Sequence, residues 1–304
     1  MSFNYLRLFA CIDEIARAGS IRKAAQAMYI TPSALDRRLQ ELERQLGAEL
    51  FERHARGMRA TAAGEIFLHH IRSHRADSER MRTEIEQLKG LQRGTVSVAA
   101  SQALTFSVLP DALNAFRASH PGVRFRVTID SHAAVLRALR EFVVDLVAVY
   151  HMPPADDVLA LHTVDQGLCA VMAAGHPLAG RSVLKMRDCL QYPLALPDAR
   201  LGLRSLLDGV FARSSLKPRV VMESNSLEML RTFVKGNEAI AFQIPAGASV
   251  GRAYDGAIAR PVQDRGLPAR RLTVAQLRER HLPLPAARFV QFLKERLGGA
   301  PSGP

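Results

Sequence analysis

Long apolar runs are absent from this chain of 304 residues. It has no stretch of about 18 apolar residues, so we expect no transmembrane helix and no membrane partner. It has only three cysteines, Cys11, Cys169 and Cys189, at wide spacing. Their odd number argues against a disulfide framework or a zinc site and suits a reducing cytoplasm. The first seven residues lack a basic segment with an apolar core behind it, so we expect no secretory signal.

Motifs of catalysis and cofactor binding are absent as well: there is no G-x-G-x-x-G, phosphate-binding loop or nucleophile elbow. His70 and His74 have chelating spacing on a predicted helix, but no third ligand accompanies them. We therefore expect no enzyme, no cofactor and no metal site. The net charge of +12 is compatible with a polyanionic partner. Residues 1–60 hold ten basic and seven acidic side chains, so charge alone locates no binding face.

The N-terminal part carries the signals of three helices. Apolar residues at helical spacing predict a helix over 3–18, ended by Gly19. Ser20 is positioned to cap a second helix over 21–28. The third is predicted to start at Thr31, a candidate N-cap, and its inward face is Leu35, Leu39, Leu42 and Leu46. Two helices joined by a short turn, the second with a polar outer face, form a helix-turn-helix.

Residues 50–61 are typical of a wing, because two short strands surround a basic turn at Gly57. The helix predicted over 62–89 is too long and too polar for a small domain, so we expect a connector and dimerisation helix. After Gly94, short strands alternate with helices, which predicts parallel strands in an α/β fold. The strands are expected near 95–99, 123–129, 145–149, 167–173, 219–222 and 239–243, and the helices near 107–118, 132–142, 203–213, 226–235 and 285–297.

Short motifs follow one another in the first 64 residues: Leu6-Arg7-Leu8-Phe9, Gly19-Ser20, Ala24-Ala25, Pro32-Ser33-Ala34-Leu35, Leu42-Glu43, Leu46-Gly47, Leu50-Phe51-Glu52-Arg53 and Thr61-Ala62-Ala63-Gly64. Their order and spacing resemble those of the LysR-type transcriptional regulators. A weaker resemblance covers nearly all of the remaining chain, at Leu109-Pro110, His120-Pro121-Gly122-Val123, Asp145-Leu146, His176-Pro177-Leu178-Ala179 and the stretch from Gly236 to Pro245.

The resemblance implies an α/β protein with an N-terminal all-α-plus-wing domain. A winged helix-turn-helix (1–61), a linker and dimerisation helix (62–90) and a periplasmic-binding-protein-like effector domain (91–304) would follow one another. The effector domain would have two lobes, 91–163 plus 269–304 and 164–268, with a small molecule bound between them. Such regulators act as dimers or tetramers, and effector binding would change the spacing of the DNA-binding heads and the bending of DNA.

Three positions depart from the family: Asp36, Phe142 and Ala239, the last of which stands where a second glycine is common. Asp36 stands where a small hydroxyl is usual, and its carboxylate could accept a hydrogen bond from a cytosine amine in the major groove. Phe142 stands where glycine is common. Among the polar residues, Arg37 and Gln40 would read guanine and adenine, and arginines of the wing would contact phosphates. The full set of candidate contacts with double-stranded DNA is Ser20, Thr31, Ser33, Asp36, Arg37, Arg38, Gln40, Arg53, Arg56 and Arg59.

Polar residues follow several strands of the second half, where open α/β sheets bind ligands. The pairs Ser101-Gln102, Ser131-His132 and Asn225-Ser226 each precede a predicted helix. The first N–H groups of these helices would face a polar or anionic effector, such as a carboxylate. Arg204 is a candidate counter-charge. The candidate effector residues are Ser101, Gln102, Ser131, His132, Arg204, Asn225 and Ser226.

The sequence alone leaves open structural roles for these polar residues and other classes of protein. The polar face of the third helix could be an ordinary solvated face, and the serines of the second half could be ordinary helix caps. A solute-binding protein of the periplasmic type would account for the α/β half without any DNA, and an enzyme with an added helical domain would need a catalytic motif.

Overall fold

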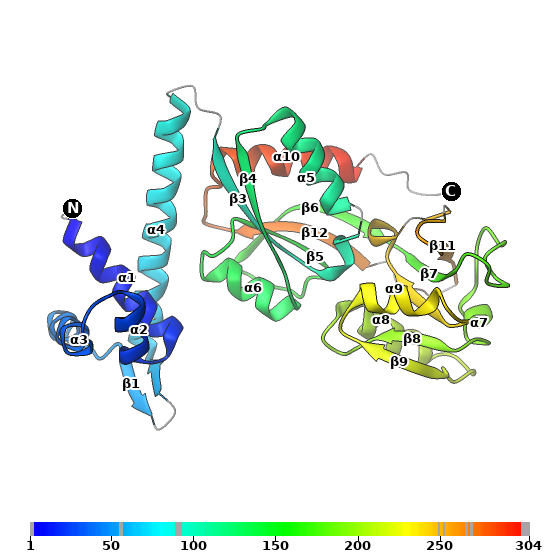
Figure 1. The fold of residues 1–304 in the computed structure, drawn as a ribbon, viewed down its shortest axis with the longest axis horizontal. Coiled ribbons are helices and arrows are strands. Elements are labelled where there is room, and N and C mark those ends of the chain that lie inside the picture. The colour runs from blue at the N-terminus through cyan, green and yellow to red at the C-terminus, as the bar shows by residue number, and fades with distance from the viewer. Residues whose placement is uncertain are drawn as a thin grey trace. The chain divides into compact units, whose positions relative to one another are not determined.

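The computed structural model describes residues 3–54, 57–88, 93–106, 108–248, 250–251, 253–264, 267 and 270–298. The chain divides into two compact units, Met1–Arg82 and Thr83–Pro304, each with its own apolar core (Figure 1). None of the helices in these described ranges is both long enough and apolar enough to cross a membrane. The domain limits expected from the sequence stay a prediction.

The first unit is a helix-turn-helix followed by a wing. Its elements are α1 (Phe3–Ala18), α2 (Ile21–Ala27), α3 (Pro32–Leu46), β1 (Phe51–His54), β2 (Gly57–Ala60) and α4 (Ala62–Leu88). β1 and β2 pair antiparallel. The core joins one face of each helix to the start of the wing: Cys11, Ile12, Ile15, Ala24, Ala25, Leu35, Leu39, Leu42, Leu50, Phe51, Leu68 and Ile71.

The inward face of α3 is shorter than its leucine spacing predicts. Leu35, Leu39 and Leu42 are buried, as expected, but Leu46 is 48% exposed. The prediction for Leu46 is wrong because it is the last residue of the helix, next to Gly47, which ends α3 with a left-handed φ of 66°. The helix therefore leaves the core one turn before its end.

Local signals set the start of both helices of the helix-turn-helix. The Ser20 hydroxyl accepts from the Lys23 amide at 3.5 Å, and the Thr31 hydroxyl accepts from the Ala34 amide at 3.3 Å. A close approach also requires a glycine at the start of α4: a Cβ at Gly64 would overlap the backbone carbonyl of Leu50. This contact fixes α4 against the start of the wing.

The second unit contains two five-stranded sheets, each the centre of one lobe. The first sheet has the order β4-β3-β5-β12-β6. Its strands are β3 (Gly94–Ala100), β4 (Val123–Ile129), β5 (Leu146–Tyr150), β6 (Val158–Gln166) and β12 (Arg270–Leu277). In Figure 1, α5 (Val108–Ser119) and α10 (Leu284–Gly298) lie on one face and α6 (His132–Arg140) on the other. We call this assembly the first lobe.

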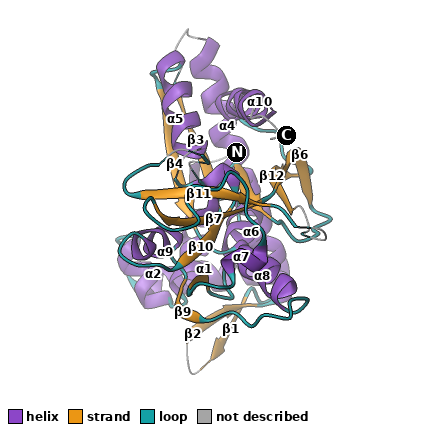
Figure 2. Ribbon diagram, turned by 90° about the vertical axis from the view of Figure 1, so that its right-hand side faces the viewer, coloured by secondary structure: helices purple, strands orange, loops and turns teal. Residues whose placement is uncertain are grey.

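The second lobe surrounds the sheet β11-β7-β10-β8-β9. Its strands are β7 (Leu168–Ala173), β8 (Leu194–Pro197), β9 (Val220–Ser224), β10 (Ile240–Gln243) and β11 (Ala257–Val262). Its helices are α7 (Met186–Cys189), α8 (Gly202–Phe211) and α9 (Leu227–Val234). Figure 2 colours helices and strands separately, and α8 and α9 pack against this sheet.

The chain crosses between the lobes twice, from β6 to β7 and from β11 to β12. Parallel pairing is confirmed for β3 with β4 and β5, and for β8 with β9 and β10. It is wrong for the crossing strands, because β12 runs antiparallel to β5 and β6, and β7 antiparallel to β10 and β11. Each lobe is therefore a mixed sheet.

Candidate DNA-binding surface and effector cleft

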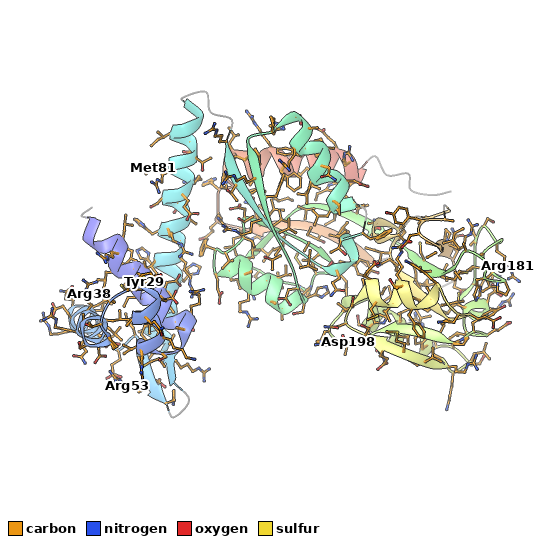
Figure 3. The ribbon with its side chains drawn as sticks, viewed as in Figure 1. Tyr29, Arg38, Arg53, Met81, Arg181 and Asp198 are labelled. Carbon is orange, nitrogen blue, oxygen red and sulfur yellow. The ribbon has the colours of Figure 1, made fainter. Side chains whose placement is uncertain are left out.

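The outer side of α3 carries most of the predicted DNA contacts. Thr31, Ser33, Arg37, Arg38 and Gln40 are exposed, while the opposite side of the helix lies in the core. Figure 3 labels Arg38 on this helix. Ser20 is only partly exposed, and its hydroxyl caps α2. An exposed polar face on the second helix of a helix-turn-helix has the form that enters a major groove.

Asp36 is not a free carboxylate. One oxygen accepts from Nη2 of Arg53 at 2.7 Å, and the other accepts from Nε2 of Gln40 at 3.2 Å. The side chain of Asp36 thus joins α3 to the first strand of the wing. It fixes one predicted base-reading group, Gln40, and one predicted phosphate contact, Arg53. The spacing of Asp36 and Gln40 by four residues was visible in the sequence, but the pairing with Arg53 was not.

The wing presents two of its three predicted phosphate contacts. Arg53 on β1 and Arg59 on β2 are exposed, and Arg59 stands opposite Glu52 in the register of the hairpin. Arg56 lies outside the described residues. The exposed arginines and the polar side of α3 therefore belong to one compact unit, tied together by Asp36.

A narrow cleft between the two lobes brings together four of the predicted effector residues. Ser101, Gln102, Ser131 and His132 line it from the first lobe. Residues at the start of α8 and α9, with the loop before α8, line it from the second lobe. The cavity measures about 20 Å³, which is room for about one water molecule. The lobes are therefore closed on each other in this structure.

The three serines predicted for the effector site differ in the hydrogen bonds of their hydroxyls, and only Ser101 and Ser131 line the cavity. Ser226 caps α9 by accepting from the Met229 amide at 3.2 Å, as an ordinary N-cap does. Ser101 and Ser131 cap no helix: the Ser101 hydroxyl accepts from the Tyr150 amide at 3.2 Å, and Ser131 makes no capping bond. Asn225 is exposed beside Ser226 and does not line the cavity. The cap interpretation thus describes Ser226 but not the serines of the first lobe.

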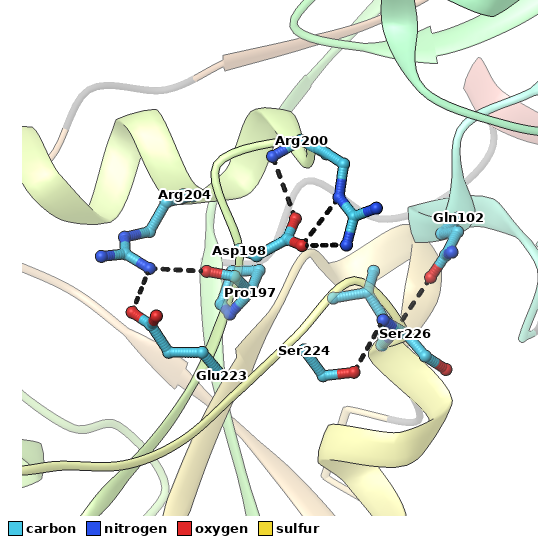
Figure 4. A network of polar contacts seen from close by, with 9 residues as sticks. Gln102, Pro197, Asp198, Arg200, Arg204, Glu223, Ser224 and Ser226 are labelled. Carbon is cyan, nitrogen blue, oxygen red and sulfur yellow. Dashed lines mark hydrogen bonds and ion pairs between the residues drawn. The ribbon is translucent and has the colours of Figure 1, made fainter.

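Gln102 joins the lobes directly (Figure 4). Its Oε1 accepts from the amide of Leu227, the first residue of α9, at 3.0 Å. Nearby, the ring of His132 lies so close to Gly202 that a Cβ there would overlap it. Burial lowers the pKa of His132, and the neighbouring His151 lowers it further. Gln102 and His132 thus occupy the space into which two helix N-termini of the second lobe point.

Arg204 makes its contacts inside the second lobe and does not line the cavity (Figure 4). Its guanidinium pairs with Asp208 at 2.7 Å and with Glu223 at 2.6 Å, and it also donates to the carbonyl of Pro197. Arg200 is the arginine that lines the cavity, and it pairs with Asp198 at 2.6 Å. The sequence interpretation missed Arg200, because two arginines four residues apart gave no signal for which one faces the other lobe.

A second contact between the lobes is aromatic. The guanidinium of Arg231 on α9 lies 3.8 Å from the ring centre of Phe106 and 5.3 Å from that of Tyr254. It also donates to the backbone carbonyl of Tyr254 at 3.0 Å. Cation–π contacts of a desolvated arginine are among the stronger ones. The segment from Gln102 to Phe106 therefore holds α9 at two points, one turn of the helix apart.

The cysteines and the candidate metal ligands of the described residues form no further site. Cys11, Cys169 and Cys189 are buried free thiols, and burial raises the pKa of Cys169 and of Cys189 to about 12. Among the residues that the structure describes, no group of three or more His, Cys, Asp or Glu side chains could hold a metal ion.

Comparison with protein families covers nearly the whole chain. A family model described as "LysR substrate binding domain" matches residues 89–298. A second, described as "Bacterial regulatory helix-turn-helix protein, lysR family", matches residues 6–65.

Individual relatives agree with these matches. The chain is 27% identical to a probable RuBisCO transcriptional regulator of Trichormus variabilis, over 76% of this chain and 70% of the relative. A full-length OxyR variant from Pseudomonas aeruginosa has a similar fold, with a TM-score of 0.70 and 18% identity over 98% of this chain and 94% of the other. Full-length CbnR in complex with its target DNA is also similar, with a TM-score of 0.64 and 20% identity over 97% and 99%. These two likenesses concern the fold.

Proposed function

The chain belongs to the LysR family of transcriptional regulators, with a helix-turn-helix for DNA and a domain for an effector, and on that premise we propose which residues bind each partner. The outer side of α3 enters the major groove, where Arg37 reads guanine and Gln40 reads adenine. Ser33 contacts DNA from the first turn of the same helix. The remaining contacts, to phosphates and at the rim of the groove, are Ser20, Thr31, Arg38, Arg53, Arg56 and Arg59.

The tie between Asp36, Gln40 and Arg53 carries this proposal. A bidentate contact discriminates between bases only when its amide is held in one orientation, and Asp36 restrains the amide of Gln40. The same carboxylate restrains Arg53, whose other donors remain available for a phosphate. Asp36 is therefore a positioning residue of the DNA surface rather than a reader of cytosine.

The effector site is the cleft between the lobes. Ser101, Gln102, Ser131 and His132 form one wall, and Arg200 on the other side takes the counter-charge role expected of Arg204. Asn225 and Ser226 directly precede Leu227, which lines the cavity, although they do not line it themselves. The hydroxyls of Ser101 and Ser131, which cap no helix, and the helix N-termini of the second lobe both favour a polar or anionic ligand, such as a carboxylate. Because the closed cavity holds about one water, the ligand enters by parting the lobes and by displacing Oε1 of Gln102 from the Leu227 amide.

Self-association follows from α4, which we assign as the dimerisation helix. Ile66, Met81 and Ile85 on this helix are exposed by 74%, 53% and 45%. Apolar side chains at this exposure on one long helix favour contact with a second copy. Parting of the lobes would then change the spacing of the paired DNA-binding heads and so the bending of DNA. Regulation of transcription in the cytoplasm, without catalysis, agrees with the regulatory function of the relatives.

A matched pair of variants on one helix tests the DNA contacts. Arg37→Ala removes the proposed guanine contact, whereas Arg44→Ala removes an arginine that pairs with Glu41 on α3. In a gel-shift assay with the region upstream of the gene, Arg37→Ala should lose about 1–3 kcal/mol of discrimination at one base pair. Arg44→Ala should keep the preference. Absence of salt-sensitive, sequence-preferring binding by the wild-type chain would refute the DNA role itself.

A thermal-shift screen of carboxylates and aromatic acids tests the cleft. A ligand at 100 times its dissociation constant adds about 2.7 kcal/mol of stability. Ser131→Ala should abolish the shift produced by any acid that binds the wild-type chain. A shift that persists unchanged in that variant and in Gln102→Ala would place the ligand elsewhere.

A further inference from the structure

Tyr29 is the most exposed large apolar or aromatic side chain among the described residues, at 95% (Figure 3). It lies in the turn between α2 and α3, two residues before Thr31, which caps α3. Its backbone adopts a left-handed conformation with φ of 54°. A bulky residue is rare in that region, because its Cβ crowds the backbone.

The turn explains why the backbone takes this shape but not why tyrosine occupies it. The Ile30 amide donates to the Ala25 carbonyl at 3.0 Å across the end of α2, which is the long bond of a Schellman motif. The left-handed residue in such a motif is usually glycine, or else asparagine. Tyrosine therefore destabilises the turn relative to either alternative.

Other strained positions in the described chain have compensating contacts. Phe142, at φ of 57°, packs on the first lobe beneath Arg280, and Asp255, at φ of 49°, pairs with Lys235. His151, at φ of 55°, donates its amide to the Arg271 carbonyl and interacts with His132. The side chain of Tyr29 makes no hydrogen bond, ion pair or ring contact with the described residues. Strain without internal compensation points to a contact outside the chain.

We propose that Tyr29 binds the DNA backbone beside α3, with its hydroxyl on a phosphate and its ring against the deoxyribose. The inference rests on the proposed binding of DNA by α3. Tyrosine hydroxyls are regular phosphate donors, and an N-terminal helix end favours a phosphate nearby. Thr31 and Ser33, at the start of α3 just after Tyr29, are exposed like it. Arg22 and Lys23 on α2 add exposed positive charge to this unit.

Three substitutions at one position separate this role from a structural one. Tyr29→Gly relieves the backbone strain, so its melting temperature should rise, while its affinity for a mixed-sequence 40-base-pair duplex should fall about tenfold. Tyr29→Asn tolerates the same backbone and should also bind more weakly. Tyr29→Phe keeps the ring and should recover only part of the affinity. The salt dependence should be unchanged in all three, because tyrosine carries no counterion-releasing charge.

The controls distinguish failure of this inference from failure of the DNA role. If the wild-type chain binds no duplex, the DNA role fails. If the wild-type chain binds, and Arg37→Ala weakens binding while all Tyr29 variants bind as the wild type does, the assignment of Tyr29 is overturned. A Tyr29→Gly chain that loses its oligomeric state in light scattering would assign the side chain to a second copy and would equally overturn it.

Discussion

Replacing Asp36 by asparagine removes the carboxylate that joins α3 to the wing and keeps the shape of the side chain. The Arg53 side chain in that pair is 67% exposed, so the ion pair is screened by solvent. Its loss should cost less than about 1 kcal/mol of folding free energy. Stability is therefore expected to stay near that of the wild type, and the consequence should be seen on DNA.

Two effects on DNA should run in opposite directions. In the wild type Asp36 compensates the charge of Arg53, whereas in the variant the full charge of Arg53 acts on its phosphate, which should steepen the salt dependence by about 0.9 in log–log slope. Lowering the salt from 200 to 50 mM should then favour the variant by about 3.5-fold more than the wild type. At the same time Gln40 loses its restraint, so up to about 1–3 kcal/mol of preference at one base pair should disappear.

Fluorescence anisotropy with specific and mixed-sequence duplexes over this salt range measures both effects. Glu41→Gln is the matched control, because it makes the same charge change on α3 at a residue that pairs with Arg44. That control should raise general affinity slightly and leave base preference intact. An Asp36→Asn chain with unchanged salt slope and unchanged preference would refute the positioning role. A shifted preference for cytosine at a single position would instead support direct reading by the carboxylate.

Three further predictions concern the effector domain. Gly202→Ala adds a methyl group that overlaps the ring of His132, so the ring should leave the cleft and its pKa should rise toward the ordinary 6.5. NMR titration of the ring measures this change. The control Gly209→Ala, which adds a methyl group in open space on the same helix, should leave the pKa of His132 unchanged. Folding lowers the pKa of His132, so the unfolded chain binds more protons than the folded one. The free energy of unfolding should therefore fall as the pH drops below about 6.5 and level off below the folded-state pKa. If urea titrations of His132→Gln show the same loss of stability as the wild type, His132 is not its cause. Cys169 and Cys189, with pKa values raised to about 12, should not react with a disulfide reagent at pH 8 until the chain unfolds, and rapid labelling of either one in the native protein would contradict their burial.

Residues close together in the chain made the first unit predictable. The spacing of Leu35, Leu39 and Leu42, together with the caps Ser20 and Thr31, predicted where α2 and α3 begin and which side of α3 is buried. Each of these signals operates within about one turn of a helix, where the local backbone decides the outcome. Only the expected burial of Leu46 was wrong, because the contacts of α3 with the core end before this last residue of the helix.

The second unit was predicted less completely, because its sheet order depends on distant pairing. Strands β6 and β12 mix apolar with polar and charged residues without regular alternation and were not anticipated, although they pair along their whole length. Strand β11 contains Pro261, which is tolerated because this strand is at the edge of its sheet. Proximity in space, which a linear pattern does not encode, decided these pairings.

The functional sites divide in the same way. The sequence by itself determined the family, the exposed polar side of α3 that we assign to DNA and the loops that line one wall of the proposed effector cleft, since these follow from local patterns and ordered motifs. Only the tertiary structure decided that Asp36 is held by Arg53, that Arg204 is held by Glu223, and that Gln102 reaches a helix 125 residues further along. The physical reason is that the pairing of a side chain depends on which donor or acceptor the fold brings within about 3 Å.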